Sequence, residues 1–119
     1  MKFIDAVSDK IFRKNNNIVY CQNLYLSDGL TEKKVNKLKK QIGQGKGNAC
    51  LLLKSDNKDD CIDIVTSFQL RSKVWEGRSP VCIGLADGKD SAAELVQVII
   101  KDCLEKTGEI DLKQFICSL

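Results

Sequence analysis

Apolar and polar residues alternate along this chain in two periods, one typical of helices and one typical of strands. Over residues 3–13, apolar residues recur at helical spacing and a run of asparagines follows, so we expect an amphipathic helix that ends there. Residues 18–26 alternate with a period of two, which predicts a strand. Thr31 then precedes a narrow apolar stripe that stops at Gly43, and this pattern predicts a second helix over residues 31–43.

Three more strands are predicted in the middle of the chain. Residues 49–54 and 61–70 are separated by a polar turn cluster at residues 56–59, and we expect them to form a hairpin. Pro80 opens the last predicted strand, residues 81–86. Within the strand at 61–70, Val65 is expected to be an exception to an alternation whose inward side comprises Ile62, Ile64, Thr66, Phe68 and Leu70.

Two helix-start patterns lie in the last third of the chain. Ser91 and Glu94 have the spacing of a capping box, which predicts a helix from there to about residue 106, ended by Gly108. Asp111 and Gln114 form a second box, which predicts a short helix over residues 112–117.

The predicted element order is α-β-α-β-β-β-α-α, which indicates a single α+β domain over residues 1–119. We expect two layers, with helices packed on a mixed, mostly antiparallel sheet of about four strands. The first β-α-β connection is expected to be right-handed, and the last three strands are expected to form an antiparallel meander.

The chain has six cysteines and no histidine, and this composition narrows the possible chemistry. The missing histidine removes the commonest general base and metal ligand, and the wide spacing of the cysteines excludes CxxC motifs and zinc knuckles. We therefore expect no metal and no cofactor. No secretion signal is visible and no apolar run approaches the roughly 20 residues of a membrane span, so we expect a cytoplasmic protein that does not associate with membranes.

In a reducing cytoplasm the six thiols should be free, whereas a secreted chain would allow three disulfides. Most of the cysteines lie in apolar segments and are expected to be core residues, with Cys82 and Cys103 buried. Cys21, which polar residues follow, is the thiol that we expect to be exposed, and Cys61 is the next candidate.

Two segments are candidate ligand-binding sites. The turn at residues 84–91 joins a strand to a helix start, where free N–H groups attract anions, and its candidates are Asp87, Gly88, Lys89 and Ser91. The simpler interpretation is a well-capped turn, and the two aspartates, at 87 and 90, oppose an anion. The second segment carries Trp75 and Arg78, two residue types that are enriched in binding hot spots, although the tryptophan could equally close one end of the core.

The positive charge is concentrated on the helix at 31–43, while the net charge of the chain is only +3. A nucleic-acid backbone could be contacted there, but the helix lacks interleaved aromatic residues and arginine, so a solvated surface is the simpler interpretation. The lysines concerned are Lys33, Lys34, Lys37 and Lys40.

Three functional hypotheses follow. The leading one is a small cytoplasmic binding or regulatory module without catalytic chemistry of its own that forms a homo-oligomer. The alternative is a small enzyme or enzyme subunit that binds an anionic metabolite at the turn at 84–91, using Asp87, Lys89 and Arg78. A weaker alternative is nucleic-acid binding through the lysine-rich helix.

Overall fold

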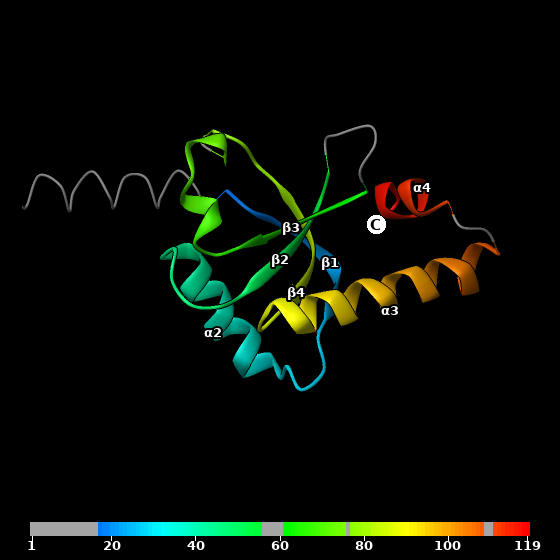
Figure 1. The fold of residues 1–119 in the computed structure, drawn as a ribbon, viewed down its shortest axis with the longest axis horizontal. Coiled ribbons are helices and arrows are strands. Elements are labelled where there is room, and N and C mark those ends of the chain that lie inside the picture. The colour runs from blue at the N-terminus through cyan, green and yellow to red at the C-terminus, as the bar shows by residue number, and fades with distance from the viewer. Residues whose placement is uncertain (1–16, 56–60, 76, 109–110) are drawn as a thin grey trace, which may run out of the picture.

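The computed structural model describes residues 17–55, 61–75, 77–108 and 111–119. The helix expected at residues 3–13 and the turn expected at 56–59 lie outside these residues. The described elements, shown in Figure 1, are β1 (Val19–Leu26), α2 (Glu32–Gly43), β2 (Cys50–Lys54), β3 (Ile62–Thr66), the 3-10 helices η1 (Gln69–Arg71) and η2 (Lys73–Trp75), β4 (Val81–Ala86), α3 (Lys89–Thr107) and α4 (Leu112–Cys117).

The strands form one four-stranded mixed sheet in the order β1-β4-β2-β3. β4 runs parallel to β1 and antiparallel to β2, and β2 pairs antiparallel with β3. This confirms the α+β class, the mostly antiparallel sheet of four strands with helices packed on it, and the expected hairpin.

The expected meander is wrong, because β4 lies between β1 and β2 instead of next to β3. β1 and β2 are consequently antiparallel and not adjacent, so the expected β-α-β crossover is absent from the described sheet. Burial explains the central position of β4: five of its six residues are buried, whereas β1 has no fully buried residue. A strand that is apolar on both faces is best accommodated inside a sheet.

Helices cover both faces of the sheet, so a third layer is added to the two that the sequence predicted. Leu51 and Leu53 of β2 belong to a core cluster with Val35 and Ile42 of α2. Cys50 and Leu52, which alternate with them, belong to a second cluster with residues of α3 and α4, such as Ile99. α2 therefore forms a layer of its own, opposite the layer of α3 and α4.

Most of the predicted helix boundaries are confirmed, and one is wrong. The Thr31 side chain accepts a hydrogen bond from the Lys34 N–H at 3.3 Å, and Gly108 ends α3 in the left-handed conformation, with φ of 72°. α3, however, begins at Lys89 with Gly88 as N-cap, which places Ser91 inside its first turn. The helix starts early because the carbonyl of Gly88 already accepts a hydrogen bond from the Ala92 N–H, at 3.0 Å.

Candidate binding groove

A pair of local hydrogen bonds forms the turn at Thr66, where β3 ends. The Thr66 hydroxyl accepts a hydrogen bond from the Gln69 N–H at 3.1 Å, and the Gln69 side-chain oxygen accepts one from the Thr66 N–H at 2.8 Å. This reciprocal arrangement has the pattern of a capping box and closes the turn that leads into η1, where the sequence pattern predicted four more residues of strand.

In and after β3, several side chains do not face the side that the alternation predicted. Ile64 and Phe68, expected to face inward, are exposed, and Ser67, expected to face outward, is buried, so the alternation is wrong for these three residues. Leu70 is buried as expected, and Val65, the expected exception, is also buried. The Ser67 hydroxyl lies within the core and donates a hydrogen bond to the Ala49 carbonyl at 3.3 Å. Val65 decides the register, because it packs in the α2-side cluster across from Leu51.

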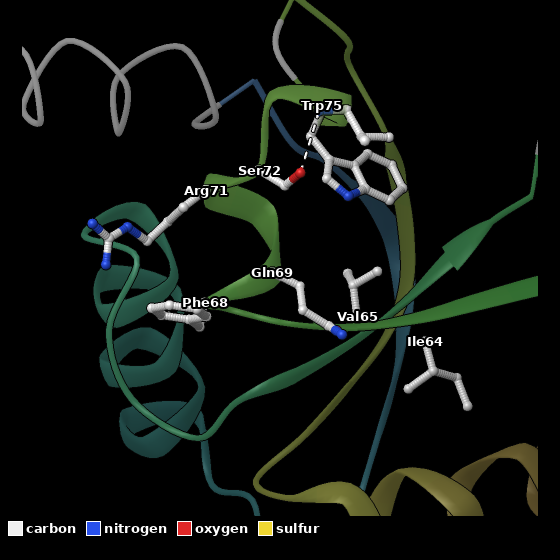
Figure 2. A pocket seen from close by; sticks show the side chains of 8 residues that line it. Ile64, Val65, Phe68, Gln69, Arg71, Ser72 and Trp75 are labelled. Carbon is white, nitrogen blue, oxygen red and sulfur yellow. Dashed lines mark hydrogen bonds between the residues drawn. The ribbon is translucent and has the colours of Figure 1, made fainter.

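An open groove of about 640 Å³ lies between β3 and the two 3-10 helices (Figure 2). Arg71 is the one charged residue among those that line it. The lining residues are Ile64, Val65, Phe68, Gln69, Arg71, Ser72, Val74 and Trp75.

Exposed apolar side chains gather in this groove. Phe68 and Val74 are each 66% exposed, the highest values among the large hydrophobic residues that the structure describes, and Ile64 is 47% exposed. Full burial of one such side chain is worth about 1.5–3 kcal/mol, so leaving several of them together in water is unfavourable. A clustered apolar surface of this kind is typical of an interaction site.

Two arginines stack on the aromatic rings of this region. The Arg71 guanidinium lies 5.2 Å from the centre of the Phe68 ring, and the Arg78 guanidinium lies 4.4 Å from the centre of the Trp75 ring. Arg78 and Trp75 also line a smaller pocket of about 230 Å³. The aromatic surface is therefore flanked by positive charge.

Trp75 has the core position that the sequence offered as one interpretation, and its role in binding stays a prediction. It is partly buried against the α2-side core cluster, and it also lines the groove. The sequence did not identify Phe68, Val74 and Ile64 as site residues. The spacing of Thr66 and Gln69 is a sequence signal that could have indicated the early strand end, and with it the exposure of Phe68.

The candidate site at the turn of residues 84–91 lies in another pocket. Asp87, Gly88 and Lys89 line a pocket of about 440 Å³ together with Phe68, which also belongs to the groove. Ser91 is partly buried in the first turn of α3 and is not a lining residue of this pocket.

Arg78 is not brought together with Lys89. Arg78 precedes β4 and Lys89 follows it, and a six-residue strand spans roughly 20 Å at about 3.3 Å per residue. The two residues also line different pockets. The fold therefore does not place Asp87, Lys89 and Arg78 around one metabolite.

The lysines named for nucleic-acid contact, at positions 33, 34, 37 and 40, are exposed on α2. Lys39 is partly buried instead, and its ammonium lies 4.5 Å from the centre of the Tyr20 ring. Among the described residues, Tyr20 is the aromatic ring that a lysine contacts in this way, and the lysine is Lys39. The exposed lysines of α2 therefore present positive charge without an aromatic ring beside them.

All six cysteines are free thiols, but their exposure differs from the prediction at both ends of the chain. Cys50, Cys82 and Cys103 are buried, Cys21 and Cys61 are partly buried, and Cys117 is exposed. Cys117 was expected in the core and points outward instead, because Phe115 and Ile116 occupy the buried face of α4. Within the described residues, no three side chains of His, Cys, Asp or Glu form a group that could hold a metal ion.

We expect Cys117 to react with iodoacetamide in the folded protein, while Cys50, Cys82 and Cys103 react only after unfolding in urea. Burial raises the pKa of the Cys50 thiol, and it raises the pKa of Cys82 to about 12, so neither is a ready nucleophile at neutral pH. Peptide mass spectrometry after timed labelling measures the order of reaction. Labelling of Cys82 as fast as Cys117 would contradict the burial described above.

Among the helices that the structure describes, none is both long enough and apolar enough to cross a membrane. Comparisons with protein-family models, with curated proteins and with solved structures found no match to this chain.

Proposed function

We propose that the protein is a small binding module, without catalytic chemistry of its own, that holds a segment of a partner protein in the groove beside β3. The observation that carries this proposal is the convergence of exposed apolar side chains on one open groove, above all Phe68 and Val74. Covering these side chains with a partner would remove apolar surface from water, which is the main favourable term in protein association.

The composition of the groove favours a protein partner over a small metabolite. Metabolite sites usually enclose most of the ligand and present a few polar groups that converge on it. This groove is open, its polar side chains are few, and the Gln69 side chain already accepts a hydrogen bond from the Thr66 N–H. Trp75 and Arg71 are, in contrast, of residue types that dominate the energetics of protein interfaces.

Homo-oligomerisation through the same surface is the second candidate, and the observation that favours it is the exposed Ile64 on the outermost strand of the sheet. An outermost strand can pair with a second copy of the chain. Under this candidate, the mass measured by analytical ultracentrifugation should rise with protein concentration, and Ile64→Lys should suppress the rise. A constant monomer mass at all concentrations would contradict homo-oligomerisation.

We also propose a cytoplasmic location. The six free thiols support this proposal, because cysteines remain unpaired in reducing compartments.

The groove is tested with a matched pair of valine substitutions. Val74→Ser removes an apolar side chain from the groove, and Val98→Ser makes the same change on α3, where Val98 is 49% exposed. Peptides selected from a random phage-displayed library on the wild-type protein should bind Val74→Ser at least about tenfold more weakly, which corresponds to about 1.4 kcal/mol. Their affinity for Val98→Ser should not change.

Both variants are expected to keep the stability of the wild-type protein within about 0.5 kcal/mol, since both sites are exposed. The proposal fails if no peptide is selected, or if the selected peptides bind Val74→Ser and Phe68→Ser as tightly as the wild-type protein.

A further inference from the structure

We infer that the partner segment binds as an extended strand on the outer edge of β3 and carries an acidic residue at the Arg71 end of the groove. This inference rests on the proposed function and specifies the conformation and charge of the partner. Its first basis is the sheet order, in which β3 is outermost and pairs only with β2 among the described strands.

The ladder between β2 and β3 shows which backbone groups of β3 point outward. The Ser67 N–H donates to the Ala49 carbonyl at 3.0 Å, and the Ser55 N–H donates to the Cys61 carbonyl at 3.3 Å. Hydrogen-bonded pairs alternate in an antiparallel ladder, so the odd-numbered residues from 61 to 67 bond toward β2. The peptide groups of Ile62 and Ile64 therefore point away from the sheet.

At the outer edge of β3, the Thr66 N–H already has a hydrogen-bond partner, while the peptide groups of Ile62 and Ile64 face outward. Thr66 would be the next outward N–H, but it donates to the Gln69 side chain at 2.8 Å. No strand of the described chain covers the peptide groups of Ile62 and Ile64. The open edge thus lies directly before the point where the chain turns to form the groove, which is the arrangement that addition of a partner strand requires.

The side chains around this edge set the pattern that a partner strand must have. Successive side chains of a strand point to opposite faces. On the α2 side, an added strand would lie beside Val65 and meet Phe68, Val74 and Trp75 across the groove. On the other face it would lie beside Ile64, which pairs with Leu52 of the α3-side cluster. Apolar residues two apart would therefore enter the groove.

Charge complementarity gives the partner its acidic residue. Arg71 is the one charged residue among those that line the groove, and its guanidinium lies 5.2 Å from the centre of the Phe68 ring at that end (Figure 2). Asp63 of β3 lies toward the opposite end of the strand and would repel a carboxylate there. A partner carboxylate is thus favoured near Arg71 and disfavoured near Asp63.

The sequences of peptides selected from the random library on the full-length protein test the inference. We expect apolar residues at every second position and an aspartate or glutamate at one end. Selection on Arg71→Glu should exchange that acid for lysine or arginine, and peptides selected on the wild-type protein should bind Arg71→Glu about tenfold more weakly. Lys101→Glu, an equal charge change at an exposed position of α3, is the control and should leave selection unchanged.

Amide hydrogen exchange with a selected peptide tests the strand pairing itself. Binding should slow exchange of the Ile62 and Ile64 N–H groups by about tenfold or more, because a paired N–H is protected from solvent.

Peptides that depend on Val74 but show helical spacing of apolar residues, or leave both amides unprotected, would overturn strand addition while the proposed function stands. Selection of a second copy's own β3 sequence would identify self-association instead and would overturn the inference of a foreign partner. Failure to select any peptide would overturn both proposals.

Discussion

Replacing Leu52 with alanine should lower the free energy of unfolding by about 2–5 kcal/mol, the range measured for Leu→Ala changes in well-packed cores. Leu52 is fully buried in the cluster that joins the sheet to α3 and α4. Leu52 packs against Gly84: a Cβ atom added to Gly84 would lie within van der Waals distance of the Leu52 Cβ and 3.1 Å from the side chain of Leu95. Neighbouring side chains are packed too tightly to move into the cavity.

Urea unfolding followed by the fluorescence of the single tryptophan measures this loss. Leu104→Ala is the matched control, since Leu104 lies on α3 but is 41% exposed, and its change should be within about 0.5 kcal/mol. Equal losses for the two variants would contradict the described packing of α3 on the sheet.

Raising the pH from 8 to 11 should reduce stability by roughly 2–3 kcal/mol through Cys82 alone. Burial raises the pKa of this thiol from 9.0 to about 12. Between these values the unfolded chain releases the proton and the folded chain keeps it, so stability falls by about 1.4 kcal/mol for each pH unit above 9. Below pH 9 the thiol is protonated in both states and the stabilisation is fully present.

Urea unfolding at a series of pH values checks the slope, with Cys82→Ala as the comparison. The variant loses packing at every pH, but its stability should fall less steeply above pH 9, because the titrating group is gone. Part of the alkaline loss should remain, since burial also raises the pKa of Tyr20 to about 12. Identical slopes in the two proteins would show that Cys82 is not the titrating group.

The sequence pattern was sufficient for the elements but not for their order in the sheet. Period-two spacing placed β1, and short apolar runs placed β2 and β4. Helical spacing and capping patterns placed α2, α3 and α4 close to their observed bounds. Strand order depends on which segment is buried on both faces, and the continuous apolar run of β4 was the available signal. We expected strands that are neighbours in the sequence to pair, and for β4 this expectation predicted β3 as the partner instead of β1 and β2.

The groove was harder to predict because it depends on where β3 ends. Phe68 is apolar and was expected to point inward in a strand that continues to residue 70, but β3 ends at Thr66 and Phe68 lies in the turn before η1. Val65 and Leu70 fill the core, and Phe68 is left outside. Trp75 could be identified by residue type alone, while Val74 carried no signal that distinguishes it from a core valine.

The position of β4 between two strands that precede it in the sequence also constrains the order of folding. The β2–β3 hairpin can form from neighbouring residues, but among the described strands β4, residues 81–86, is the one that pairs with β1. During synthesis, a chain that ends before residue 81 therefore carries an unpaired first strand and a hairpin with both of its edges open. Such edges are the usual sites of wrong pairing between chains. The pairing of β1 with β4 joins residues about 60 positions apart, such as Val19 and Val81, and long-range contacts of this kind slow folding.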